Sequence, residues 1–399
     1  MPIALLALTL SAFAIGTTEF VIVGLIPTIA ADLGVDLPSA GLLVSLYALG
    51  VAIGAPLLTA LSGRMPRKTL VLALMSLFTA GNLLAWQAPG YGALVAARIL
   101  TGLAHGVFFS IGSTLATALV PKDKAASAIA LMFTGLTVAL VTGVPLGTFV
   151  GQHFGWRATF LAVAALGLIA VVGSALFLPR GLAHRPPASL AQQARVLAEP
   201  RLLLVYAKTA IGYGGSFIPF TFLAPILTEV SGFEPGAVGW VMLVYGVSVA
   251  VGNLWGGRLA DRLGPVLALR WIFALLAAVL LLFQFAAPHK ALAVVTVLLW
   301  GAVAFGNVPG LQVYVVKQAE RFAPQAVDVA SGLNIAAFNL GIAMAAWAGG
   351  LIVSRLGLMH TPWIGAVVVL VSLALTHWSG RLDRRAGIAS QGPQAAAAH

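Results

Sequence analysis

Residues 16–34 read GTTEFVIVGLIPTIAADLG and belong to an apolar run that extends from about residue 5 to residue 31. A helix that crosses a bilayer needs about 20 apolar residues. One carboxylic acid, Glu19, interrupts the run near its middle. The stretch therefore predicts a membrane-spanning helix with a single acid deep inside it.

The composition extends this interpretation to the whole chain. Of its 399 residues, 60% are hydrophobic and only 8% are charged. A soluble domain needs more polar surface than this, whereas lipid solvates an apolar exterior. The absence of cysteine excludes disulfides and thiolate chemistry. The first apolar run is too long for the core of a signal peptide, and no small-residue cleavage site follows it.

Twelve apolar runs are candidate spans, and the longest break between them, at 179–201, divides the chain into two halves. The approximate limits of the spans are 5–31, 41–61, 69–88, 92–116, 126–150, 157–178, 202–228, 237–257, 266–286, 291–315, 328–353 and 362–379. The predicted fold is an all-α membrane protein with six-helix bundles at 1–179 and 202–380, a cytoplasmic linker at 180–201 and a disordered cytoplasmic tail at 381–399.

The two halves match each other at a constant offset of 198 residues. The matched pairs include Pro27 with Pro225, Tyr47 with Tyr245, and Arg64 with Arg262. Two parallel six-helix repeats build transporters whose binding site lies at the membrane midplane between the halves. The repeat therefore indicates alternating access by rocking of one half against the other.

The basic residues predict the orientation of the chain. With the N-terminus in the cytoplasm, sixteen of the 22 Lys and Arg fall in cytoplasmic segments. Positive residues stay on the cytoplasmic side, so both termini are expected there, in a bacterial inner membrane. This bias also explains the net charge of +11 without a nucleic-acid partner.

Four stretches are typical of one transporter family. They are GTTEFVIVGLIPTIAADLGV on the first span, AARILTGLAHGVFFSIG on the fourth, TGLTVALVTGVPLGTFVGQHFGWRATF on the fifth, and GGRLADRLG in the loop at 256–264. Over about residues 10–380 the chain resembles the major facilitator superfamily. Within it, the chain resembles the drug:proton antiporter branch with the arabinose and sugar efflux permeases and the chloramphenicol-resistance exporters.

The resemblance implies roles for two groups of residues. The fifth-span motif, with Gly143, Pro145 and Gly147, would shape the interface between the halves, although the glycine pattern is equally typical of plain helix packing. The cytoplasmic loop motifs would act in gating, through Arg64, Arg67, Lys68, Gly257, Asp261, Arg262 and Gly264. Gly63 stands where the family has an acid, which leaves Asp261 as the better-formed copy.

The candidate proton-coupling residues are Glu19, Arg98 and His105. Of the eleven Asp and Glu, only Glu19 is expected deep in a span. Burial disfavours an ionised carboxylate there, so Glu19 would take up and release a proton, or else be a neutral packing group. Arg98 and His105 are two turns apart and share a helix face, with His105 level with Glu19. Pro27 stands where some relatives carry a second acid, so coupling would rest on Glu19 alone.

The candidate substrate contacts combine polar and aromatic side chains, as mixed-polarity ligand pockets do. They are Glu19, Tyr47, His105, Phe109, Phe217, Gln312, Asn334 and Phe338. Each of the second-half residues is more often helix packing than a ligand contact. Lys208, two turns into the seventh span, is interpreted as a side chain that snorkels to the cytoplasmic surface.

These observations predict a proton-coupled exporter of small molecules such as sugars or drugs, which exchanges them for protons as a functional monomer. The alternatives are a sugar importer or facilitator and, less favoured, a non-transporting membrane receptor. No Walker-type phosphate loop or metal-ligand cluster occurs, so no cofactor, metal or enzymatic activity is expected. The sequence does not distinguish among sugar, phenicol and purine substrates.

Overall fold

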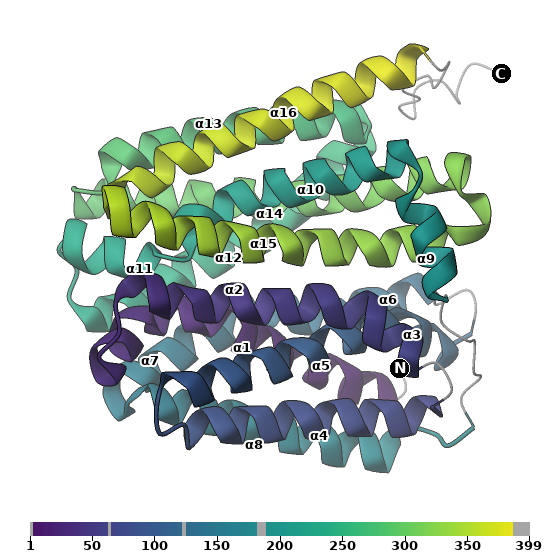
Figure 1. The fold of residues 1–399 in the computed structure, drawn as a ribbon, viewed down its shortest axis with the longest axis horizontal. Coiled ribbons are helices and arrows are strands. Elements are labelled where there is room, and N and C mark those ends of the chain that lie inside the picture. The colour runs from purple at the N-terminus through teal and green to yellow at the C-terminus, as the bar shows by residue number, and fades with distance from the viewer. Residues whose placement is uncertain (1–2, 63–64, 122–124, 182–188, 386–399) are drawn as a thin grey trace.

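A computed structural model describes residues 3–62, 65–121, 125–181 and 189–385. Within these residues the chain is helical, and twelve helical segments are long and apolar enough to cross a membrane. The predicted all-α fold with twelve spans is therefore confirmed. Seen along its shortest axis, the molecule consists of roughly parallel helices that run from one end to the other (Figure 1).

The first six spans are built from ten helical segments. They are α1 (Ile3–Leu33); α2 (Leu37–Ile53), continued by η1 (Gly54–Leu58) and α3 (Thr59–Leu61); α4 (Arg67–Trp86); α5 (Tyr91–Ala118); α6 (Ala125–Val138), continued by η4 (Ala139–Gly143) and α7 (Val144–Phe154); and α8 (Trp156–Phe177). The segments η1 and η4 are π-helical insertions that let one span continue through a local change of pitch.

The last six spans follow the short helix α9 (Leu190–Leu197). They are α10 (Pro200–Phe220), continued by α11 (Leu223–Pro225) and η5 (Ile226–Val230); α12 (Pro235–Leu263); α13 (Pro265–Ala286); α14 (Lys290–Phe322); α15 (Val327–Leu356), preceded by η6 (Pro324–Ala326); and α16 (Thr361–Arg385), preceded by η7 (Leu358–His360). The spans of the first half lie below those of the second half in Figure 1.

The two halves meet along a seam where α2 lies beside α15 and α12 lies beside α7 and η4. Ser45 on α2 donates a hydrogen bond to the carbonyl of Ala343 on α15, at 2.7 Å. On the other side of the seam, Gly246 of α12 lies so close to η4 that a Cβ there would be 2.2 Å from the carbonyl oxygen of Leu140. The seam is thus formed by direct backbone approach as well as by side chains.

The two ends of the seam differ. Both the start of α1 and the end of α16 lie at the end that carries α9, which we call the linker end (Figure 1). A cavity of about 420 Å³ opens between the halves there, and its lining includes Pro56, Arg67, Gln193 and Leu333. At the opposite end, the ring of Phe222 packs against Gly41 of α2 and Gly349 of α15 and fills the seam.

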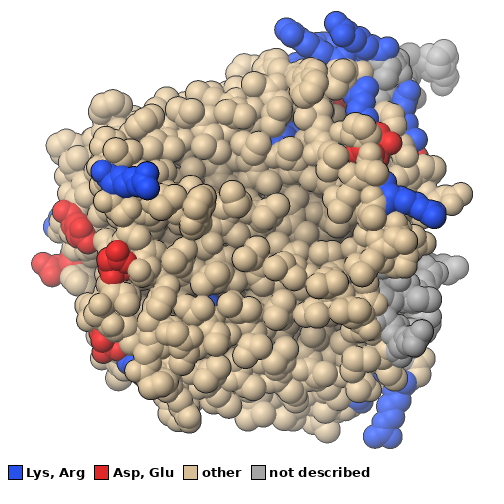
Figure 2. Space-filling view, viewed as in Figure 1, with Lys and Arg blue, Asp and Glu red and all other residues tan. Residues whose placement is uncertain are grey.

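Charge is also divided between these two ends. On the visible face, most Lys and Arg lie at the linker end and most Asp and Glu lie at the opposite end (Figure 2). The apolar belt between them carries many exposed large hydrophobic side chains, as a lipid-facing surface does.

The predicted linker contains a helix, α9, which the sequence analysis did not specify. Its helix α9 begins with a capping box between Ser189 and Gln192. Gln193 of α9 donates to the carbonyl of Pro56 in the first half, at 3.1 Å. Val196 packs into an apolar cluster of the second half. The linker therefore contacts both halves beside the cavity.

Residues 381–385, which the sequence analysis assigned to a disordered tail, belong instead to α16, which continues to Arg385. Asp383, inside the segment expected to lack structure, is buried and hydrogen-bonded. Residues 386–399 lie outside the described part of the chain.

Close packing between α2 and α5 depends on Gly102. A Cβ at this position would lie 2.3 Å from the carbonyl oxygen of Tyr47, whereas one at Gly92, on the same helix, would meet no atom within 4 Å. We expect Gly102→Ala to lower the free energy of unfolding by about 1–3 kcal/mol, because the two backbones must separate. Gly92→Ala is the matched control and should not destabilise the protein. Thermal unfolding in detergent measures both variants, and equal stability would contradict this packing.

Candidate functional site

The candidate site is centred on Glu19, halfway along α1. Its side chain is buried, although the residue keeps 8% of its surface exposed. The nearest ionisable group is His105 of α5, whose Nδ1 lies 3.9 Å from Glu19 Oε2, too far for a hydrogen bond. Instead, His105 Nδ1 is hydrogen-bonded to the hydroxyl of Tyr47 on α2, at 2.9 Å. Three helices of the first half thus bring together three predicted site residues.

Arg98 joins the same helices without pairing directly with the acid. Its guanidinium donates to the carbonyls of Thr18 at 2.7 Å and Leu43 at 3.3 Å, with a longer contact to the carbonyl of Glu19 at 3.5 Å. The guanidinium carbon also lies 4.1 Å from the centroid of the Tyr47 ring. The buried cation is therefore stabilised by backbone dipoles and a ring face.

The carboxyl of Glu19 lacks a direct hydrogen-bonding partner in the described part of the chain. No hydrogen bond to that carboxyl is found within the described residues, and its neighbours are an imidazole and a cation that already has other partners.

The second half faces Glu19 with aromatic rings. Phe20, the residue after Glu19, lies 6.4 Å from Phe217 and 6.3 Å from Phe305 between ring centroids. Tyr213 lies 4.9 Å from both Phe217 and Phe338. We call Phe20, Tyr213, Phe217, Phe305 and Phe338 the aromatic cluster. The predicted residues Phe217 and Phe338 belong to it, next to the buried acid.

Three members of the aromatic cluster were missing from the predicted site. Phe20 is adjacent to Glu19 in the sequence, but neighbouring residues on a helix point in different directions, so adjacency alone did not place it at the seam. Tyr213 precedes Phe217 by one helical turn, which is a usable signal once Phe217 is chosen. Nothing in the sequence around Phe305 indicates its position.

The structure places two other predicted substrate residues away from Glu19. Asn334 donates to Gln312 at 2.9 Å and accepts from Thr209 at 2.8 Å. Gln312 in turn donates to Ser331. These side chains satisfy one another within the second half, and no hydrogen bond or ion pair of the described residues joins them to Glu19. The remaining predicted residue, Phe109, packs 4.9 Å from the ring of His105.

The glycine face of the fifth span packs against α1. A Cβ at Gly143 would lie 2.2 Å from Thr17 Oγ1, and one at Gly147 would lie 2.6 Å from Val21. Pro145 of α7 instead lies near α12 across the seam. A Cβ added at Gly239 of α12 would lie 3.5 Å from the carbonyl oxygen of Pro145. The span therefore packs against the helix that carries Glu19 and also contacts the other half.

The predicted gating residues lie at the linker end, well separated from this site. Lys68 donates to the carbonyls of Ala175 and Leu178 at the end of α8. Arg67 is buried and lines the cavity. Asp261 and Arg262 are exposed, and Gly257 lies near Pro309. Gly264 has a φ of +77°, a conformation that glycine adopts without strain. Arg64 falls outside the described residues.

Known proteins share this architecture and sequence. The Major Facilitator Superfamily pattern matches residues 8–323. The chain belongs to this superfamily. It is therefore a membrane transporter of small molecules and not an enzyme.

Several relatives match almost the full length of the chain. It is 52% identical over 382 residues to an uncharacterized MFS-type transporter, YtbD, of Bacillus subtilis (strain 168), covering 96% of both chains. It is 42% identical to the inner membrane transport protein YdhP of Escherichia coli (strain K12), covering 94% of this chain and 96% of the relative. It is 34% identical to a chloramphenicol resistance protein of Streptomyces lividans, with coverage of 94% and 95%.

A solved structure also shows the same fold. It is a bacterial homolog of the human lysosomal transporter Spinster, in an inward-facing and occupied conformation. The TM-score is 0.75 at 17% sequence identity, covering 94% of this chain and 96% of the other.

The repeat supplies a matched test of the hydrogen bond between Tyr47 and His105. Tyr245 is the counterpart of Tyr47, is equally buried, and has a hydroxyl without a partner. We expect Tyr47→Phe to lower the free energy of unfolding by about 1 kcal/mol, because it leaves the imidazole without its hydrogen bond. Tyr245→Phe should leave stability unchanged or raise it. Thermal unfolding of both variants compares them, and equal losses would refute a specific role for the Tyr47 hydroxyl.

Proposed function

We propose that the protein is a proton-coupled antiporter that exports small molecules, with Glu19 as the proton carrier. The observation that carries this proposal is the position of the Glu19 carboxyl, which is buried at mid-span, has no hydrogen bond, and lies beside the aromatic cluster at the seam. A titratable group at this place can respond to whatever enters between the halves. Intramembrane acids of transporters commonly serve in this way.

Alternating access explains how exchange would occur. The linker end has a cavity between the halves, and Phe222 fills the seam at the opposite end, which supports an inward-facing state. Rocking about the seam would reverse this arrangement and expose the centre to the other side. If substrate and proton compete for the region around Glu19, each binding event displaces the other, and this competition is sufficient for antiport.

The chemistry of the centre favours an aromatic or otherwise apolar substrate with a polar group. The second half contributes rings, with one hydroxyl, on Tyr213, while the first half contributes the acid, an imidazole and a phenol. A sugar would need several hydrogen-bonding partners around its ring, and the aromatic cluster offers few. The similarity to a chloramphenicol resistance protein points the same way. A sugar importer or facilitator is the second candidate, and the resemblance to exporters stands against it.

The transport assay uses inverted membrane vesicles with an imposed pH gradient and a fluorescent pH indicator. We expect chloramphenicol, as the first probe, to cause proton release in wild-type vesicles, and arabinose to serve as the sugar comparison. Glu19→Gln should reduce this release to the level of vesicles without the protein, because the amide binds no proton. Glu234→Gln, which alters an exposed acid, is the control. Undiminished proton release by Glu19→Gln would contradict the proposal.

The distribution of charge supports an orientation with the linker end, and therefore both termini, in the cytoplasm. The chain has no cysteine, so single cysteines report accessibility without background. In intact cells we expect a membrane-impermeant maleimide to label Gln87→Cys at the opposite end and to leave Glu320→Cys at the linker end unlabelled. Labelling of Glu320→Cys alone would show the reverse orientation.

A further inference from the structure

Lys208 is a buried cation that the proposed mechanism does not use. It lies on α10 and is completely buried, so the interpretation that it snorkels to the surface is wrong. Its ammonium makes no hydrogen bond to any described residue. It lies instead on the face of the Tyr314 ring of α14, with Nζ 3.3 Å from the ring centroid. A charge buried in this way is costly unless it is compensated.

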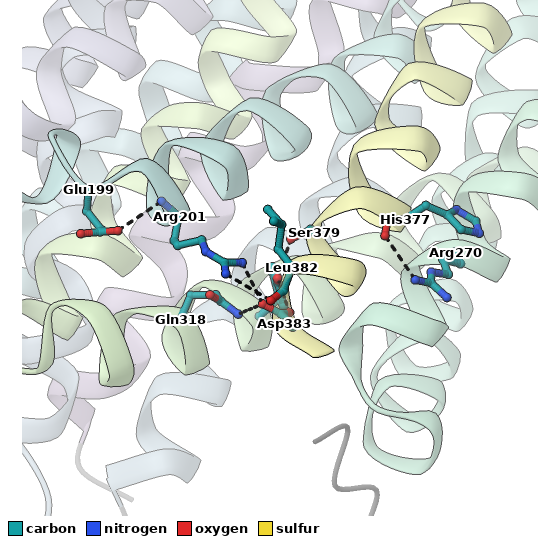
Figure 3. Close-up of polar contacts among 9 residues, drawn as sticks. Glu199, Arg201, Arg270, Gln318, His377, Ser379, Leu382 and Asp383 are labelled. Atoms are coloured by element: carbon teal, nitrogen blue, oxygen red, sulfur yellow. Dashed lines mark hydrogen bonds and ion pairs between the residues drawn. The ribbon is translucent and has the colours of Figure 1, made fainter. Parts of the chain in front are cut away.

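Tyr314 connects this lysine to a buried carboxylate. The Tyr314 hydroxyl donates to Asp383 Oδ2 on α16 at 2.7 Å and also contacts Ser379. The other oxygen, Asp383 Oδ1, accepts from Gln318 at 3.2 Å and from Arg201 at 3.4 Å. Figure 3 shows Asp383 between Gln318 and Arg201. The ring face of Tyr314 thus contacts the Lys208 amine, and its hydroxyl is hydrogen-bonded to the Asp383 carboxylate.

The charges in this cluster do not balance when every group is ionised. Arg201 reaches Asp383 from the partly exposed end of α10 and already neutralises the carboxylate. The other titratable group buried in this region is Tyr206, whose hydroxyl has no partner. The helix α15 adds only the amide of Asn334, and Arg270 of α13 is directed to the carbonyl of His377 (Figure 3). An ionised Lys208 is therefore the uncompensated cation, and loss of its proton makes the cluster neutral.

We propose that Lys208 is a second proton-binding site, located in the second half and connected to the linker end through Tyr314 and Asp383. In the binding step, the neutral amine of Lys208 accepts one proton and becomes an ammonium over the Tyr314 ring; in release, that proton leaves to water at the linker end and the amine regains its lone pair. Asp383 stabilises the ammonium form through space, and Arg201 limits that effect by pairing with the same carboxylate.

This site lies on the helix that carries the aromatic cluster. Tyr213 and Phe217 follow Lys208 on α10, and the next residue, Thr209, holds Asn334. The hydroxyl of Ser372 on α16 also donates to the carbonyl of Lys208, at 2.8 Å. A change of charge at Lys208 would act on the packing of α10 against α14 and α16. Participation of this proton in transport rests on the proposed antiport, whereas its binding at Lys208 does not.

The proton occupancy of Lys208 can be measured directly in the full-length protein without any substrate. The chain has few lysines, so ¹⁵N labelling of lysine side chains gives a sparse NMR spectrum in which ammonium and neutral amine differ in chemical shift. We expect one resonance to change from the amine to the ammonium position as the pH is lowered from about 9 to about 5, within the range known for buried lysines. Lys208→Arg should remove that resonance and keep a cation for folding.

Two further variants separate a proton site from a purely structural lysine. Asp383→Asn should move the midpoint of the Lys208 resonance to lower pH by about 1 unit or more, because the ammonium loses its anion. Lys290→Met, which alters an exposed lysine, should leave it unchanged. The proposal is overturned if the Lys208 resonance stays at the ammonium position, or at the amine position, over this whole pH range. Since Glu19→Gln is tested by transport alone, either proposal can fail without the other.

Discussion

A charge buried in a membrane-spanning bundle must be compensated by the protein itself, because lipid supplies no hydrogen bonds. This chain meets that constraint differently at three of its buried ionisable groups, Arg98, Lys208 and Glu19. Arg98 is compensated by carbonyls of α1 and α2 and by the ring of Tyr47. Among the described residues, the ammonium of Lys208 meets only the ring face of Tyr314, and the carboxyl of Glu19 has no hydrogen bond.

How completely each charge is compensated distinguishes a structural role from a role in proton binding. The guanidinium of Arg98 stays protonated, and its bonds tie three helices of the first half together. A carboxyl or an amine can give up its charge when compensation is incomplete. The groups with the poorest partners are therefore the ones whose protonation can follow a change in their surroundings. In a transporter whose halves rock, a seam that opens supplies that change.

The seam itself has features that suit such motion. Some of its contacts are close approaches of two backbones, such as Gly246 of α12 against η4. Others are made by a ring, such as Phe222 against Gly41 and Gly349. None of these contacts involves a charged side chain, so breaking them exposes no unpaired charge. The linker helix α9 is an exception in that it contacts both halves at the cavity. Movement at that end must either break the bond from Gln193 to Pro56 or carry α9 with the first half.

The parts of this arrangement that depend on local pattern could be predicted from the sequence. The twelve spans follow from runs of apolar residues, and the placing of His105 level with Glu19 follows from depth in the membrane. The pairing of Asn334 with Gln312 and the burial of Lys208 could not be predicted, because each depends on how distant helices rotate about their axes. A run of uniformly apolar residues gives no amphipathic stripe to indicate that rotation. For the same reason, the position of Phe305 in the aromatic cluster could not be predicted.

The internal repeat connects the two halves of the candidate site. At the offset of 198 residues that pairs Tyr47 with Tyr245, the position of Glu19 corresponds to Phe217. Equivalent positions of parallel repeats face each other across the seam, and here Phe20, beside the acid, lies 6.4 Å from Phe217. The first half thus presents a carboxyl where the second presents a ring. If both positions held acids, the two carboxylates would repel each other when both were ionised. If both held rings, neither position could bind a proton. Under the proposed function, the divergence of this one duplicated position would give a centre that binds both a proton and an apolar molecule.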